Sequence, residues 1–318
     1  MPTLGEDDII LFVSAVKDVL LPVIYIALSW IQIKIYSKSI TSPITDLSNA
    51  TMLIASGDFD TVIDEGSTFR EIAVLQSNFN IMAKDLRNNE LLKKDFVTNV
   101  SHEFKTPLSI IKGYSDVLCD KNISEEKRIE YAKMISQESE RLLHLTSNVL
   151  RMSKLNNQEI LVSPVSFSLD EQIRRMVLML EKKWSEKDIE LDIELNHVTV
   201  SGDEELLSQV WLNLFDNAIK FSKQGGTIKL TLDYGEHNTA VVHIIDNGIG
   251  MTKEDCTRIF DQFYQADVSH SKAGNGLGLT IVQRIITLHK GTIDVTSELG
   301  NGSDFKVVIP VNMPALSE

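Results

Sequence analysis

The sequence has little cysteine, few basic residues and few long hydrophobic runs, and each shortage excludes a class of protein. Its two cysteines, Cys119 and Cys256, match no metal-ligand spacing and cannot build a disulfide framework, so we expect free thiols in a reducing compartment. Lysine and arginine number 31 against 45 acidic residues, and the net charge of −14 argues against a surface that binds nucleic acid. A hydrophobic content of 43% is too low for a protein with many membrane spans.

One stretch near the N-terminus is apolar enough to cross a membrane. Residues 9–33 exceed the ~20 residues that a span needs, although Lys17-Asp18 interrupts them at one edge. We therefore expect a single transmembrane helix centred on Val19–Ile35. The alternative is a signal peptide, but no small-residue cleavage site follows. Lys34 lies just beyond the apolar run, which predicts that the rest of the chain is cytoplasmic.

Residues 37–89 read as two amphipathic helices joined by a connector. The first helix is expected from Pro43 to about Ala55, where Ser56-Gly57-Asp58 breaks it, and the second begins near Phe69. Helices this short are not stable singly. We therefore expect a parallel dimeric coiled coil.

The second helix continues without a breaker into the octapeptide Ser101-His102-Glu103-Phe104-Lys105-Thr106-Pro107-Leu108. Helical spacing places His102 about 150° from the middle of an apolar stripe, so that it faces solvent beside Glu103. Pro107 removes an amide donor, which predicts a disturbed helix nearby. The alternative is an ordinary surface histidine. The stripe consists of Phe96, Val100, Phe104, Pro107, Ile111, Tyr114 and Leu118.

A returning helix is expected after a turn at residues 119–123. Ser124 is a suitable N-cap, and apolar residues then recur at helical spacing to about Leu155. Two such hairpins from two chains would make a four-helix bundle, so residues 90–157 are assigned to a dimeric hairpin. Its apolar positions are Ile129, Ala132, Ile135, Leu142, Leu145, Val149 and Met152.

Residues 164–313 alternate between helical and strand patterns, which indicates an α/β sandwich domain. Helices are expected at 169–187, 204–222, 253–259 and 277–289, and strands at 189–195, 227–234, 239–245, 292–297 and 303–309.

Two motifs in this domain suit a nucleotide. Asn213, Asn217 and Lys220 share one helix face, where oxygen-bearing side chains suit Mg²⁺ and the lysine suits phosphate oxygens. A plain polar surface face is the alternative. Asp246-Asn247-Gly248-Ile249-Gly250 ends a strand, where the carboxylate can accept a hydrogen bond from the adenine amino group and Gly248 and Gly250 allow close approach. Alone, this segment could be a simple turn.

Two further motifs follow. The aromatic-rich segment 259–264 precedes residues 265–275, which have few hydrophobic side chains and suggest a lid. Gly274-Asn275-Gly276-Leu277-Gly278-Leu279 then opens a helix, whose N-terminal amides can bind an anion. Dinucleotide-binding folds use similar glycine spacing, but there it follows a first strand.

The octapeptide resembles the phospho-acceptor box of sensor histidine kinases of two-component systems, and all eight positions fit. Residues 37–89 resemble a HAMP signal-relay module through Pro43, Gly57-Asp58 and Phe79-Asn80-x-Met82. The four nucleotide motifs resemble the N, G1, F and G2 boxes of the GHKL-type ATP module, which is shared with gyrase. Gly300-x-Gly302 resembles its closing segment. The resemblance covers about residues 37–310 and implies a membrane kinase built as residues 1–36, 37–89, 90–157 and 164–313.

The resemblance implies that ATP·Mg²⁺ binds the α/β domain, with adenine on Asp246, the metal on Asn217 and the phosphates near Lys220 and Gly274–Gly278. His102 would attack the γ-phosphoryl group, Glu103 would take up the proton, and an aspartate of a response regulator would then receive the phosphoryl group. Thr106, in Glu103-x-x-Thr106, would support phosphatase activity. The departures are Arg70-Glu71-Ile72-Ala73 in the relay and Gln262 and Gln265, where many relatives carry arginine. The two glutamines leave Lys272 as the expected lid cation.

Two other classes of protein remain as alternatives, a GHKL-type ATPase and a non-catalytic membrane signalling scaffold. About eighteen residues precede the apolar core, too few for a folded domain. We therefore expect the signal to enter through the membrane helix or from a neighbouring membrane protein. A constitutive kinase or a longer gene product stays open.

Overall fold

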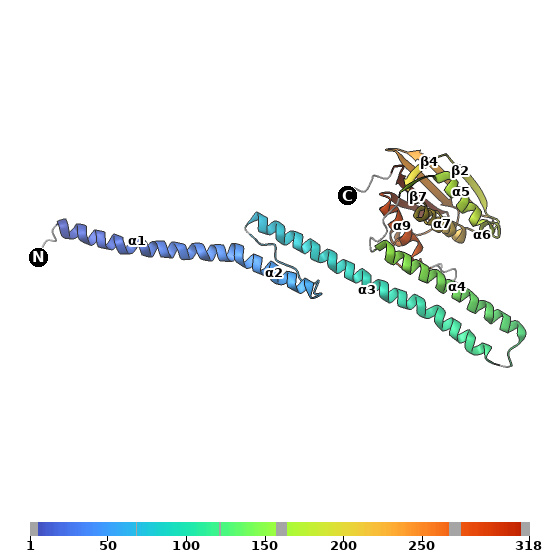
Figure 1. Cartoon of the computed structure of the whole chain (residues 1–318), viewed down its shortest axis with the longest axis horizontal. Helices are drawn as coiled ribbons and strands as arrows, with labels where there is room; N and C mark the ends of the chain where they lie inside the picture. The colour runs from blue at the N-terminus through green and yellow to red at the C-terminus, as the bar shows by residue number, and fades with distance from the viewer. Residues whose placement is uncertain (1–5, 68, 121, 157–163, 267–274, 313–318) are drawn as a thin grey trace. The chain divides into compact units, whose positions relative to one another are not determined.

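The computed structural model describes residues 6–67, 69–120, 122–156, 164–266 and 275–312, without the side chains of residues 6–13 and 15. The chain divides into two compact units, Met1–Val97 and Thr98–Glu318, and each is considered by itself (Figure 1).

The first unit begins with the apolar helix α1 (Glu6–Tyr36), followed by a π-helical turn η1 (Ser37–Thr41) and helix α2 (Ser42–Ala55). Among the residues that the structure describes, one helical stretch, beginning at Val16, is long and apolar enough to cross a membrane. None of its most apolar 18-residue window is buried within the protein. Its apolar side chains are therefore available to lipid, as the sequence predicts.

A connector joins α2 to the long helix α3 (Arg70–Leu118). The side chain of Asn80 fixes this connector, since its oxygen accepts from the Ile63 N–H at 2.9 Å and its amide donates to the Ile63 carbonyl at 2.8 Å. Arg87 pairs with Asp60 at 2.9 Å. The helix starts predicted at Pro43 and Phe69 are confirmed to within one residue. A small core forms between the helices and connector from Ala50, Ile54, Ile63, Phe79 and Ala83.

This core uses only part of the apolar face that the sequence gives to α3. Phe79 is buried, but Leu75 and Met82 are 51% and 45% exposed. Gln76 and Ala83 occupy the buried positions instead. The reason is that one chain offers α3 a single helix and a connector, which cover only one side of it.

In the second unit, α3 and α4 (Glu125–Asn156) form the expected helical hairpin. Every member of the predicted stripe is at least half-buried, Pro107 is buried and His102 is exposed, which confirms the predicted orientation. Helix α3 remains continuous through Pro107. Ile129, predicted on the buried side of α4, is 51% exposed. Stacking of Tyr114 on Tyr131, with ring centroids 5.1 Å apart, joins the two helices near their turn.

The rest of the second unit is the α/β domain. Its main sheet has the order β2-β4-β5-β7-β6 and is antiparallel except for the parallel pair β2 and β4. Helix α7 packs on β5, and α9 packs on both α7 and β6. The strands are β1 (Val165–Ser168), β2 (Glu190–Leu195), β3 (Thr199–Gly202), β4 (Thr227–Gly235), β5 (Thr239–Asp246), β6 (Thr292–Glu298) and β7 (Gly302–Pro310). The helices are α5 (Leu169–Met179), α6 (Glu181–Ser185), α7 (Glu204–Phe221), α8 (Lys253–Arg258) and α9 (Gly278–Leu288).

The five predicted strands and all but one of the predicted helices are confirmed, with ends that differ by one residue. The helix predicted over 169–187 was wrong as one element, because it ends at Met179 and a separate turn of helix follows Leu180. Strands β1 and β3, which pair antiparallel, were missed. At four residues each, they carry a pattern too short to separate a strand from a loop.

Alternate residues of β4 and β5 are buried, so one face of the sheet carries the core beneath the helices. Buried His289 ties two of these helices together. Its Nε2 accepts the Asp203 N–H at 3.0 Å, at the N-terminus of α7, and its Nδ1 lies 2.8 Å from the Ile285 carbonyl in α9. This arrangement requires a neutral imidazole with the proton on Nδ1. Burial lowers the pKa of His289, against the opposing effects of the Ile285 carbonyl and Asp203.

We predict that His289→Ala lowers the free energy of unfolding by about 2 kcal/mol at pH 7.5, because a buried amide loses its acceptor. The lowered pKa also fixes a pH dependence. Below about pH 6.5 the unfolded chain takes up a proton on this imidazole before the folded chain does, so wild type loses stability as the pH falls. Guanidinium titrations followed by tryptophan fluorescence at several pH values measure both effects. The exposed turn variant His237→Asn is the control, and an equal loss in both variants would contradict the prediction.

Candidate nucleotide-binding site and acceptor histidine

Helix α7 carries the first group of candidate residues. Asn213, Asn217 and Lys220 are all half-buried on one side of it, while Trp211 and Phe215 on the other side are completely buried. Asp203 caps the N-terminus, where its carboxylate accepts the Leu206 N–H at 3.0 Å. Burial of the opposite, apolar face in the core therefore fixes the direction in which the polar face points.

The C-terminus of α7 is held by a lysine that no motif indicates. The Lys187 ammonium donates to the carbonyls of Ile219, Lys220 and Ser222 at 2.7, 2.9 and 3.1 Å. It satisfies carbonyls that a helix end leaves without partners. The backbone of Lys220 is thus fixed beside the candidate phosphate site.

The environment of Lys220 suits a phosphate ligand. Burial lowers the pKa of Lys220, while nearby Asp216 raises it. Asp216 is itself paired with Lys183 at 2.5 Å. The Lys220 ammonium also lies 4.7 Å from the ring centroid of Phe221. A partly desolvated cation of this kind attracts an anionic ligand more strongly than an exposed one does.

Asp246 ends β5 on the buried face of the sheet, with only 5% of its surface exposed. Burial raises its pKa to about 6, although hydrogen bonds from the Gly248 and Ser303 amides oppose the shift. The Gly248 N–H donates to Asp246 Oδ1 at 2.8 Å. A buried carboxylate with this orientation can accept a hydrogen bond from an exocyclic amine such as that of adenine.

Close packing surrounds the loop after Asp246. A Cβ added to Gly248 would clash with the carbonyl of Phe221 at the end of α7. One added to Gly250, where φ is +63°, would clash with the carbonyl of Glu298. The Ile249 N–H donates to the Phe221 carbonyl at 3.2 Å, so this loop is attached directly to α7.

The N-terminus of α9 meets α7 on its polar side. A Cβ on Gly278 would lie 3.5 Å from Asn213 Oδ1, and the preceding Leu277 is completely buried. Gly276 has φ +64° and packs on the backbone of Phe263, whose N–H donates to the Gly276 carbonyl at 3.0 Å. Lys272 and Gly274, also predicted at the site, lie outside the described residues.

The acceptor candidates lie on α3. Glu103 faces Arg141 of α4, with 4.0 Å between Oε2 and Nη2, and Thr106 Oγ1 donates to the His102 carbonyl at 3.4 Å. The structure thus brings the nucleotide candidates of α7, β5 and α9 together and leaves His102 exposed on the hairpin. Sequence reasoning missed Lys187, Arg141 and His289, because each acts on a partner far away in the chain.

Three family models match the chain in order. The HAMP domain matches residues 35–88, the His Kinase A (phospho-acceptor) domain matches 92–158, and the histidine kinase-, DNA gyrase B-, and HSP90-like ATPase matches 202–313. Sensor histidine kinase YclK of Bacillus subtilis is 36% identical over 91% of this chain and 62% of its own length. Heme sensor protein HssS of Staphylococcus epidermidis is 37% identical over 82% of this chain and 56% of its own length. The chain thus spans about three fifths of these relatives.

Solved structures show the same fold. Full-length ShkA in complex with AMPPNP is 28% identical with a TM-score of 0.53, over 70% of this chain and 46% of its own. Histidine kinase ThkA in complex with the response regulator protein TrrA is 24% identical with a TM-score of 0.59, over 71% of this chain and 64% of its own.

We predict that Gly276→Ala weakens nucleotide binding far more than Gly225→Ala does. Both glycines have positive φ, +64° and +66°, so both substitutions cost about 1 kcal/mol in backbone strain. Only at Gly276 would the new Cβ lie 2.5 Å from a backbone atom of Phe263, whereas Gly225 has nothing within 4 Å. Calorimetric titration with ADP compares them. Equal affinities would show that the glycine contact does not shape the site.

The family matches and the structure divide the chain into the same series of domains. An apolar helix precedes a relay module, a phospho-acceptor hairpin and an ATPase-type domain, and the catalytic part lies in the cytoplasm. The chain belongs to the sensor histidine kinases of two-component systems.

Proposed function

We propose that this chain is an ATP-dependent protein-histidine kinase that phosphorylates His102 and passes the phosphoryl group to an aspartate of a cytoplasmic response regulator. The observation that carries the proposal is the presence, in one chain, of an exposed His102 with half-buried Glu103 beside it on a hairpin and a set of nucleotide motifs on α7, β5 and α9. Neither a GHKL-type ATPase nor a signalling scaffold needs both.

The nucleotide is held by its two ends in this proposal. Asp246 accepts from the adenine amino group, while Lys220 and the amides of Gly276–Gly278 receive the phosphates. Asn217, with Asn213 beside it, offers oxygen atoms of the kind that Mg²⁺ takes in phosphoryl-transfer sites. When bound, the metal would neutralise phosphate charge. Lys272 and Gly274 are included in the proposed phosphate site on sequence grounds.

His102 and its neighbour Glu103 each have one role in the proposed acceptor chemistry. A neutral His102 attacks the γ-phosphorus, the bond from that phosphorus to the bridging oxygen breaks, and ADP leaves. Glu103 takes up the proton from the other ring nitrogen, which keeps the phosphorylated ring neutral. Because His102 is exposed on α3, an incoming ATP domain or regulator can reach it.

The working unit is proposed to be a homodimer. On the hairpin, Leu108, Ile129 and Leu143 are 50%, 51% and 68% exposed. In the relay, Leu75 and Met82 are exposed as well. Exposed apolar residues at helical spacing on two modules favour a second copy as the cover. We also propose that a neighbouring membrane protein is the source of the signal.

We predict that His102→Gln binds ATP but takes no label, and that Asn217→Ala loses both binding and labelling. The first change removes only the nucleophile, and the second removes the proposed metal ligand. The measurement is acid-labile, base-stable phosphate on the full chain after incubation with labelled ATP. His144→Gln, an exposed histidine of the same hairpin, is the control and should label normally. Label on His102→Gln would overturn the acceptor assignment. Binding without label in wild type would favour a scaffold, and ATP turnover without label would favour an ATPase.

A second prediction concerns Thr106, whose hydroxyl is proposed to orient a water on the regulator's phospho-aspartate. Thr106→Ala should leave labelling of His102 unchanged and slow loss of phosphate from the regulator. Thr106→Ser, which keeps the hydroxyl, serves as the matched variant and should retain the activity. The measurement is the decay of phosphorylated regulator after addition of each variant. Equal decay with wild type and Thr106→Ala would remove Thr106 from the mechanism.

A further inference from the structure

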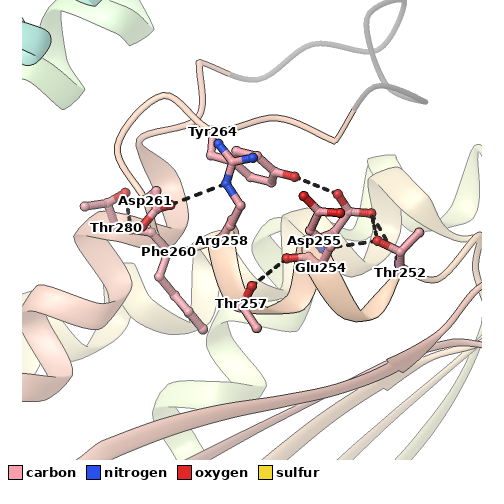
Figure 2. Close-up of polar contacts among 9 residues, drawn as sticks. All are labelled: Thr252, Glu254, Asp255, Thr257, Arg258, Phe260, Asp261, Tyr264 and Thr280. Carbon is pink, nitrogen blue, oxygen red and sulfur yellow. Dashed lines mark hydrogen bonds and ion pairs between the residues drawn. The ribbon is translucent and has the colours of Figure 1, made fainter.

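A hydrogen-bonded group lies between α8 and the aromatic segment (Figure 2). The Tyr264 hydroxyl donates to Asp255 Oδ1 at 2.7 Å. The other oxygen of Asp255 accepts from the Thr252 hydroxyl at 2.7 Å and from the Thr252 N–H at 3.2 Å. Asp255 therefore joins the N-terminal cap of α8 to the tyrosine that ends the aromatic segment.

The tyrosine ring is held on a second side. The guanidinium of Arg258 lies 4.4 Å from the centroid of the Tyr264 ring, and its Nε is 3.8 Å from Asp261 Oδ2. Figure 2 shows the Tyr264 hydroxyl pointing at Asp255 and the Arg258 side chain beside the ring. The Thr252 hydroxyl and then the Tyr264 hydroxyl lower the pKa of Asp255. The bond to Asp255 raises the pKa of Tyr264, so the hydroxyl stays protonated as the donor.

The backbone next to Tyr264 contacts the glycine loop. Phe263 has a left-handed φ of +63°, and its N–H donates to the Gly276 carbonyl. Within the first turn of α9, the Thr280 hydroxyl donates to the Phe260 carbonyl at 3.0 Å. The aromatic segment and the start of α9 are thus joined at two points. A left-handed residue other than glycine is costly, so it persists only where neighbours hold it.

We propose that Tyr264 is a positioning residue for nucleotide binding. Its hydrogen bond to Asp255 holds the left-handed turn at Phe263, and that turn fixes the amides of Gly276–Gly278 for the phosphates. The inference rests on the proposed function, in which this loop receives phosphate. It adds a contact whose effect falls on the phosphate end of the nucleotide, because the adenine end is held separately by Asp246.

The test is Tyr264→Phe in the full chain, which removes only the hydroxyl. Affinities for ADP and for adenosine are measured by calorimetry, together with the temperature of unfolding. Loss of one hydrogen bond to a carboxylate should weaken ADP binding about threefold to tenfold. Adenosine, which has no phosphate, should bind as it does to wild type. Tyr234→Phe, at an exposed tyrosine of β4, is the matched control and should change neither affinity.

Asp255→Asn and the double variant complete the cycle. If the two side chains act as one unit, the double variant should lose no more ADP affinity than Tyr264→Phe alone. Unchanged ADP affinity in Tyr264→Phe would overturn the proposal. So would an equal loss for ADP and adenosine, or a large fall in the unfolding temperature, because either would mean a general structural role. Wild type that binds no ADP would instead overturn the proposed function.

Discussion

One ammonium, that of Lys187, contacts three carbonyls at the C-terminus of α7 and so fixes the helix on which the proposed nucleotide site depends. A helix end concentrates partial negative charge on its last carbonyls, and a cation there stabilises it. At the opposite end, Asp203 and His289 satisfy the first amides. With both ends fixed and Trp211 buried between them, the polar face of α7 has one orientation. The loop of Gly248 and the start of α9 are then attached to that face.

Much of this domain could be read from the sequence, and the reasons are physical. The period of apolar residues in 204–222 predicts both the helix and the shared face of Asn213, Asn217 and Lys220. Motifs that use glycine are visible because few other residues satisfy a positive φ or a close backbone approach. The contacts of Lys187 with the end of α7 and of His289 with Asp203 carry no such signal, since these partners are more than 30 residues away. Strands β1 and β3 were missed because a pattern of only four residues, even the alternating Val165–Ser168, also occurs by chance in loops.

The helices of the hairpin and the relay show a different limit of prediction from sequence. Sequence periodicity predicted the orientation of His102 correctly, because an apolar stripe on one side of a helix determines which side is exposed to solvent. It could not tell which apolar residues pack within the chain and which remain for the proposed second copy. The exposed Leu75, Met82 and Ile129 fall in that gap. They are apolar yet exposed in the single chain, whereas Gln76 is polar yet buried.

Residues 56–67 of the connector form no helix or strand, yet both backbone groups of Ile63 are bonded to the side chain of Asn80. An amide held in this way exchanges its hydrogen with solvent only when the connector separates from α3. The exchange rate of that single amide therefore reports release of the connector from Asn80, whether the connector detaches from an intact α3 or α3 unwinds around Asn80. Hydrogen exchange at the Ile63 amide thus reports local motion of the connector.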